Sequence, residues 1–231
     1  MKKKSVIISP IRQIHALLPW VPGKISIWLI FIMTACLFLS SCCNKDSVET
    51  ARLALDSAEL KLIPYKLGEQ YKFVHSNGFG FYFTVTEDKL QWYEQRDLCE
   101  WNCCGKDYYS YQVRTAKLVS EYPKLTIELF EGERAYDYYP RMLSLSINNR
   151  HYCYFPYDSL AHFMCDTIQK TYCHDSIMIN NKIYTHVVEA YVNNYSFTAD
   201  STILLPEWVY YNKLGLLQIK MSNHETYSLD Q

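Results

Sequence analysis

The sequence predicts a mainly β protein whose antiparallel meander forms an open or closed barrel, with a two-sheet sandwich as the alternative. Tyrosine is unusually frequent, with 21 among 231 residues, and aromatic side chains suit the half-buried surface of a pleated sheet. Short stretches also alternate between apolar and polar residues, and asparagine or glycine borders them. This combination predicts strands that are joined by tight hairpins.

Three stretches show the alternation most clearly, with a period of two residues: FGFYFTV at 79–85, KLTIELF at 124–130 and RMLSLSI at 141–147. Each predicts a strand with one buried face. Asparagine and glycine tolerate the positive φ of hairpin turns, which we therefore expect at Asn77-Gly78, Asn148-Asn149 and Asn180-Asn181. Such local hairpins imply antiparallel pairing.

One stretch departs from this pattern and predicts one short helix near 157–168. Its sequence is YDSLAHFMCDTI and it follows Phe155-Pro156. The apolar residues that recur there at helical spacing are Leu160, Ala161, Phe163, Met164 and Ile168. We expect this helix to cover a face or an edge of the sheet.

The first 41 residues have the layout of an export signal. Five basic residues and no acidic residue lie in this segment, and its last part, from Ile25 to Ser41, is uncharged. The uncharged part is shorter than the roughly 20 residues that a membrane-spanning helix needs, and small residues end it. We therefore predict a signal peptide at 1–41.

Leu39, Ser40, Ser41 and Cys42 resemble the lipobox of bacterial lipoproteins. The resemblance implies that Cys42 receives diacylglycerol, that cleavage occurs before it, and that the new amino terminus is acylated. Several acyl chains anchor a protein stably, since each buried methylene contributes about 0.8 kcal/mol. The alternatives are an uncleaved signal anchor and lipidation at Cys36.

The charge of the mature chain restricts its partners. Without residues 1–41 the chain carries 18 basic and 24 acidic residues, a net charge of −6. Proteins bind nucleic acid through a basic surface, so we expect no nucleic-acid partner. We expect the membrane to be a partner through the lipid anchor, and a protein or glycan partner is left open.

Residues 42–61 are predicted to form the lipidated cysteine and a tether. Val48, Ala51, Leu55 and Ala58 recur at spacings of three and four, which suits a short helix, but the segment is polar overall and a solvated tether is favoured. Pro64 favours extended geometry at the residue before it and marks the start of the folded part. We predict a single β-rich domain at 62–231, which is long enough for its own core.

Two segments resemble uncharacterised lipoproteins that are common in Bacteroidota: LIPYKLGEQYKFVHSNGFGFYFTV at 62–85 and WVYYNKLGLLQIKMSNHETYSL at 208–229. The N-terminal segment has a proline near its start and continues into a hairpin, and the C-terminal segment is similar to the closing strands of those proteins. The resemblance implies a lipid-anchored protein of the outer membrane, on its periplasmic or cell-surface face. It implies no activity.

Seven cysteines follow Cys42, and they predict one to three disulfides with at least one free thiol, because thiols oxidise outside the cytoplasm. Six of them form the candidate disulfide or thiol set: Cys99, Cys103, Cys104, Cys153, Cys165 and Cys173. The sequence leaves their pairing open. No further pair of ligands accompanies the first three, so no metal site is predicted.

The sequence contains none of the common catalytic motifs, and we predict no catalytic residue and no cofactor. Cys173, His174 and Asp175 are consecutive, but neighbours in an extended segment point to opposite faces. Tyrosine pairs such as Tyr210-Tyr211 are expected to split in the same way. We predict a non-enzymatic binding or structural module. The alternatives are a carrier of a lipid or other apolar ligand in a curved sheet, and a hydrolase without a recognisable motif.

Overall fold

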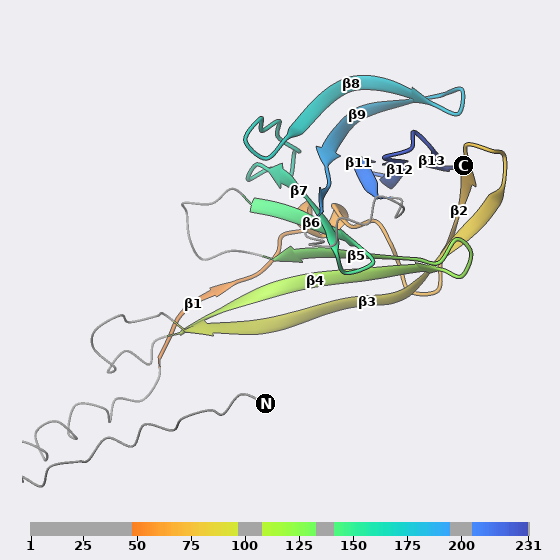
Figure 1. Ribbon diagram of the computed structural model, residues 1–231. Coiled ribbons are helices and arrows are strands. Elements are labelled where there is room, and N and C mark those ends of the chain that lie inside the picture. Colours follow the sequence, from red (N-terminus) through yellow and green to blue (C-terminus); the bar gives the residue numbers. More distant parts are fainter. Residues whose placement is uncertain (1–47, 97–107, 133–140, 195–204, 231) are drawn as a thin grey trace, which may run out of the picture. The chain divides into compact units, whose positions relative to one another are not determined.

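The fold is described from a computed structural model, which describes residues 48–96, 108–132, 141–194 and 205–230. These residues form one 13-stranded sheet (Figure 1). The strands are β1 (Glu49–Leu53), β2 (Gln70–His75), β3 (Gly80–Arg96), β4 (Tyr108–Ser120), β5 (Leu125–Gly132), β6 (Arg141–Ile147), β7 (His151–Tyr157), β8 (Thr171–Ile179), β9 (Lys182–Tyr191), β10 (Asn193–Asn194), β11 (Pro206–Asn212), β12 (Gly215–Met221) and β13 (Thr226–Leu229). The prediction of a mainly β, antiparallel fold is confirmed.

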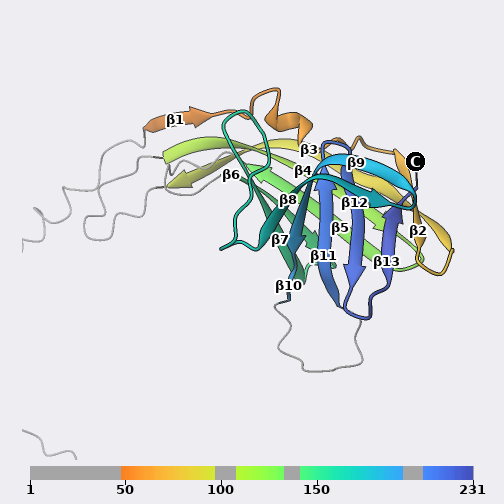
Figure 2. The same cartoon turned by 90° about the horizontal axis from the view of Figure 1, so that it is seen from above.

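The sheet is nearly closed into a barrel, with one unsealed seam. Its strand order is β10-β7-β6-β5-β4-β3-β2-β13-β12-β11-β9-β8, and β1 pairs in parallel with β4. Figure 2 shows β11, β12 and β13 side by side. β10 follows β9 along the chain and pairs with β7 through Asn193–Tyr152 and Asn194–His151. β8 ends the strand order, so the seam lies between the two end strands of the sheet.

The inside of the curved sheet is filled by apolar side chains from alternate strand positions. The registers of β4, β5 and β6 align Leu118, Ile127 and Ile147, each at most 2% exposed. Further along the same sheet Phe73 and Phe83 meet edge to face, with ring centroids 5.1 Å apart. The buried faces predicted for 124–130 and 141–147 are therefore confirmed.

The predicted hairpin turns are also confirmed. Asparagine and glycine there have the positive φ that tight turns require: 90° at Gly78, 53° and 55° at Asn148 and Asn149, and 49° and 62° at Asn180 and Asn181. The expected splitting of tyrosine pairs holds as well, since Tyr211 is fully buried and Tyr210 is half-buried.

The short helix predicted near 157–168 is wrong. The Asp158 carboxylate accepts hydrogen bonds from the N–H groups of Leu160 and His162, each at 2.9 Å, and Ala161 has a φ of 56°. These contacts form tight turns in place of a helix. The apolar residues do not share one face, because Phe163 packs on the core whereas Ile168 is 88% exposed. The segment does lie along the edge of β7, where Tyr157 and Phe163 form a bridge.

The prediction of a tether at 42–61 is wrong for the residues of this segment that the structure describes. Residues 49–53 form β1, Glu59–Lys61 form a short 3-10 helix, η2, and Leu55 is buried. Glu59 is 1% exposed and pairs with Arg141. The Arg114 guanidinium donates to the carbonyls of Leu60 and Tyr65, and its Nε lies 3.2 Å from the Asp88 carboxylate. The folded domain thus includes residues well before 62.

The predicted signal peptide at 1–41 and the lipidation site Cys42 lie outside the described residues, as do Cys99, Cys103 and Cys104. Over the ranges that are described, no helix has the length and apolar character that crossing a membrane requires.

Candidate functional site

A groove of about 740 Å³ lies beside the β8–β9 hairpin. Three segments far apart in the sequence form it: His162 and Phe163 before β8, the hairpin itself, and the β11–β12 turn at Asn212–Leu214. The Asn212 side-chain amide donates to the carbonyl of Thr185 at 3.2 Å, which fixes that turn against β9. We call this cavity the β8–β9 groove.

The floor of the groove is apolar. Tyr184, Val187 and Val188 line it and are at most 4% exposed. Phe163 closes one side, and its ring meets that of Tyr211 edge to face at 5.7 Å. The apolar surface that a ligand could contact comes mainly from two exposed residues of the lining, Ile183 and Leu214.

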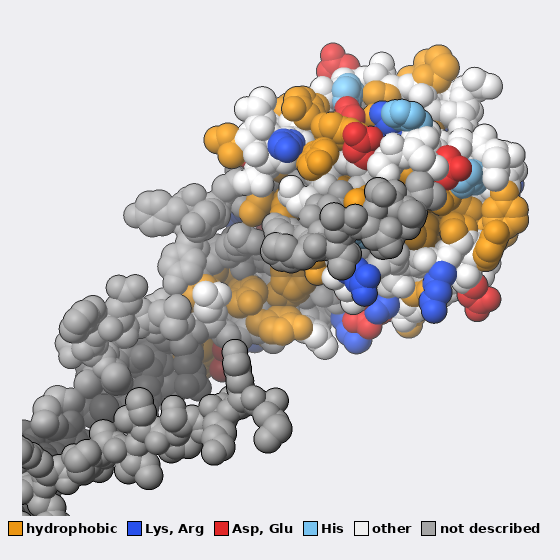
Figure 3. Space-filling view, in the orientation of Figure 1, with side chains coloured by type: hydrophobic (Ala, Val, Ile, Leu, Met, Phe, Trp, Pro, Cys, Tyr) orange, Lys and Arg blue, Asp and Glu red, His pale blue; other side chains and the backbone are white. Residues whose placement is uncertain are grey.

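The margin of the groove is polar and carries charges of both signs. Lys182 and Lys213 line it, as do three histidines, whereas Asp175 is the acidic residue in the lining. The Lys182 ammonium lies 5.6 Å from the centre of the Tyr184 ring, directly by the apolar floor. Figure 3 shows basic, histidine and acidic side chains close together among apolar ones on the part of the surface formed by β8 and β9.

His186 has an unusual backbone conformation in the middle of β9. Its φ is 51°, a left-handed value that side chains other than glycine seldom adopt within a strand. Residues held in such conformations cost about 1–3 kcal/mol each and cluster at functional sites. His186 lines the β8–β9 groove, so the strained position and the cavity coincide.

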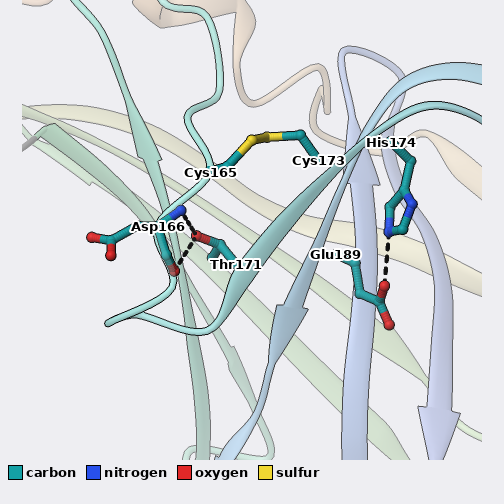
Figure 4. The surroundings of a disulfide bond; sticks show 6 residues. All are labelled: Cys165, Asp166, Thr171, Cys173, His174 and Glu189. Atoms are coloured by element: carbon teal, nitrogen blue, oxygen red, sulfur yellow. Dashed lines mark hydrogen bonds and ion pairs between the residues drawn. A yellow bond between two sulfur atoms is a disulfide. The ribbon is translucent and has the colours of Figure 1, made fainter.

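A disulfide borders the groove (Figure 4). The bond joins Cys165 and Cys173, and the Cα atoms of these two residues are 5.5 Å apart. It links the segment before β8 to β8 itself. The Asp166 N–H donates to the Thr171 hydroxyl at 2.9 Å, and that hydroxyl lies 3.1 Å from the Asp166 carbonyl. Cys173 lines the groove, so the disulfide ties a residue of the lining to the segment before β8.

His174 and Glu189 approach each other beside the disulfide (Figure 4). The His174 Nε2 lies 2.8 Å from a Glu189 oxygen, and the Tyr210 hydroxyl donates to the other oxygen at 2.9 Å. A nucleophile with this pair would resemble a catalytic triad. The adjacent sulfur, that of Cys173, is in the disulfide, and within the described residues no hydroxyl or thiol is hydrogen-bonded to His174.

The remaining cysteine of the candidate set that the structure describes is Cys153. It is a free thiol with no exposed surface, and burial raises its pKa well above the ordinary value. A thiol of this kind is unreactive at neutral pH. Cys153 therefore belongs to the core and lies apart from the groove.

Glu131 is a buried acid that was not among the predicted site residues. It has no exposed surface, and no hydrogen bond of ordinary geometry reaches its carboxyl oxygens. Burial raises its pKa to about 8, against the lowering effects of the Tyr157 hydroxyl and of Arg114. The sequence did contain a signal, because Glu131 continues the alternation of Leu125, Ile127 and Leu129 on the inward face of β5.

No protein-family model, no curated protein and no solved structure matches the chain. Support for a function therefore comes from the residues and geometry of the site itself.

The buried carboxyl of Glu131 predicts that stability falls as pH rises. Its pKa is about 8 in the folded protein and about 4.3 in an unfolded chain, so between these values the unfolded state ionises while the folded state stays protonated. From pH 5 to pH 7.5 the wild type should lose on the order of 3 kcal/mol more of its unfolding free energy than Glu131→Gln, measured by urea denaturation of the full chain.

Glu121→Gln is the matched control, because Glu121 is exposed in the turn between β4 and β5. It should follow the wild-type pH dependence. The same pH dependence in Glu131→Gln would contradict the assignment of a protonated, buried carboxyl group.

Proposed function

We propose that the protein is a lipid-anchored protein of the outer membrane that acts as a non-enzymatic binding module, with the β8–β9 groove as its ligand site. The lipobox-like residues 39–42 support the anchor, and the basic, uncharged and small-residue order of 1–41 supports export. The groove supports ligand binding.

The proposal rests on the difference between the inside of the curved sheet, which is filled by side chains, and the β8–β9 groove, which is open. Core side chains occupy the inside of the curved sheet, which disfavours a carrier that encloses its ligand there. The groove instead lies where the β8–β9 hairpin leaves the closed part of the sheet, and its volume of about 740 Å³ is of the size that small-molecule sites have. Apolar side chains that line a concave surface beside polar ones are also typical of such sites.

Hydrolysis is the second candidate function, and the His174–Glu189 pair favours it. A histidine oriented by a carboxylate supplies a general base, but hydrolysis through a covalent intermediate also needs a nucleophile at hydrogen-bonding distance. The disulfide removes the Cys173 thiol from that role. Binding without chemistry therefore agrees better with the geometry.

Lipidation predicts a specific labelling result. Cells grown with radiolabelled palmitate should label the wild-type chain and a Cys36→Ala variant but not Cys42→Ala, whose uncleaved precursor should accumulate, because the thioether and the cleavage both require the Cys42 sulfur. Equal labelling of Cys42→Ala and the wild type would contradict the anchor.

Ligand binding in the groove predicts local changes in the methyl NMR spectrum of the full lipidated chain, held in nanodiscs of zwitterionic phospholipid. Octan-1-ol, a neutral amphiphile, should shift the methyl signals of Val187, Val188 and Leu214 in the groove and leave Leu143 in the core unchanged. Octan-1-ol also dissolves in the lipid of the nanodiscs. The experiment records signals of the protein only, so alcohol in the lipid is not counted as binding.

Thr185→Trp should abolish these shifts by filling the groove, whereas Thr86→Trp, at an exposed position on β3, should retain them. Shifts that are absent from the wild type, or that persist unchanged in Thr185→Trp, would contradict the groove as the ligand site.

A further inference from the structure

We propose that one arm of the sheet lies on the phospholipid bilayer, with the exposed side chains of Leu90, Trp92 and Tyr93 in the interfacial region. The arm consists of β1, residues 90–96 of β3 and residues 108–114 of β4, which pair with one another (Figure 1). The inference rests on the lipid anchor of the proposed function. It adds a surface through which the folded domain itself contacts the membrane.

The chain enters the folded domain at the outer end of this arm. Glu49, the first residue of β1, pairs with Tyr108, the first residue of β4, and Tyr108 also pairs with Arg96, the last residue of β3. Glu49 is the seventh residue after Cys42, and a chain of that length spans at most about 25 Å when fully extended. Lipidation of Cys42 therefore keeps the outer end of the arm within this distance of the bilayer.

The outer part of β3 exposes apolar and aromatic side chains. Leu90 is 48% exposed, and Trp92 and Tyr93 are each 42% exposed. Among the described strands only β4 pairs with this part of β3, because β2 pairs with residues 80–84. Trp92 and Tyr93 are consecutive in a strand and point to opposite faces, so an aromatic ring stands on each side of the unpaired edge.

These side chains are of the kinds that membrane interfaces contain. Tryptophan and tyrosine are enriched there because their rings are mainly apolar and one end of each is polar. The Arg52 guanidinium lies 4.5 Å from the centre of the Trp92 ring. Arginine covers apolar surface with its stem while its charged group stays in water or among phosphates. Trp92 and Arg52 together therefore suit the boundary between acyl chains and headgroups.

The charges of the arm do not require an anionic membrane. Two ion pairs lie where the arm leaves the rest of the sheet, Asp88–Arg114 at 3.2 Å and Glu87–Lys89 at 2.8 Å. The other charged side chains that the structure describes on the arm are Glu49, Arg52 and Glu94. Attraction to anionic lipid depends on clusters of basic residues, and this set contains none. The contact therefore gains from burial of apolar surface, and we expect it on a zwitterionic bilayer.

A bilayer is favoured over a protein partner because the anchor already holds it beside the arm. Free molecules lose translational and rotational freedom when they associate, whereas a tethered surface has lost most of that freedom beforehand. Three partly exposed side chains form a contact much smaller than a stable protein interface. A contact of this size is sufficient only for a surface that the chain itself keeps close.

The test is paramagnetic broadening in the NMR spectrum of the full lipidated chain, held in nanodiscs of zwitterionic phosphatidylcholine. Part of the lipid carries a doxyl spin label near the headgroup end of an acyl chain. The indole N–H signal of Trp92 should lose most of its intensity, because the ring lies beside the label. Trp208 is the internal reference, since it lies on β11 outside the arm, and its signal should keep its intensity.

Leu90→Ser/Tyr93→Ser keeps Trp92 as the reporter and should restore most of its intensity, because two apolar side chains of the contact are removed while the tether is unchanged. Leu67→Ser/Tyr82→Ser is the matched control, because it replaces the same residue types at exposed positions outside the arm. It should leave the Trp92 signal broadened. An unchanged methyl signal of Leu143 in the core shows that each variant is folded.

The outcomes separate this inference from the proposed function. If the chain takes up palmitate at Cys42 and stays in the nanodiscs, but the Trp92 signal is as sharp as that of Trp208, the arm does not contact the bilayer and the anchor stands. Broadening that persists in Leu90→Ser/Tyr93→Ser would also overturn the inference, because the tether alone then brings the arm near the lipid.

A Trp92 signal that changes with the number of chains per nanodisc, and not with the spin label, would overturn the inference in favour of a second copy of the chain. A chain that takes up no palmitate and does not stay in the nanodiscs contradicts the proposed anchor itself.

Discussion

The arrangement of the molecule depends on how the two ends of one curved sheet meet. Neighbouring antiparallel strands are rotated relative to each other, so a sheet of this many strands curls and brings its end strands together. Full closure would pair β7 with β9 along their length. Instead β8 pairs with β9 from residue 182 to 190, and only the short β10 is left to pair with β7. The β8–β9 hairpin therefore diverges from the closed part of the sheet, and the groove lies beside it.

Two chain segments cover what the sheet leaves open. The segment between β7 and β8 lies along the edge of β7 and is joined to β8 by the disulfide between Cys165 and Cys173. The N-terminal part of the domain, through η2, is held by Arg114 and by the pair between Glu59 and Arg141. Covering edges in this way limits strand pairing between molecules. His162 and Phe163 of the covering segment line one side of the β8–β9 groove.

The sequence was sufficient for features that depend on local pattern. Alternation placed Ile127 and Ile147 in the core, and the paired asparagines marked the hairpins, because side-chain direction and positive φ are properties of a few neighbouring residues. The prediction of a helix at 157–168 failed because helical spacing of apolar residues does not reveal the turn at Asp158 or the disulfide. The groove joins residues from 162 to 214, and only the long-range register of β8, β9 and β11 brings them together.

Backbone hydrogen exchange along β8 tests most directly whether this strand is the open end of a nearly closed sheet. Residues of an antiparallel edge strand direct their N–H groups alternately toward the neighbouring strand and away from it. We expect alternating slow and fast exchange from Tyr172 to Met178, and slow exchange throughout the middle of β5, which has a strand on each side. Uniformly slow exchange along β8 would show a paired edge and would contradict the open seam beside which the groove lies.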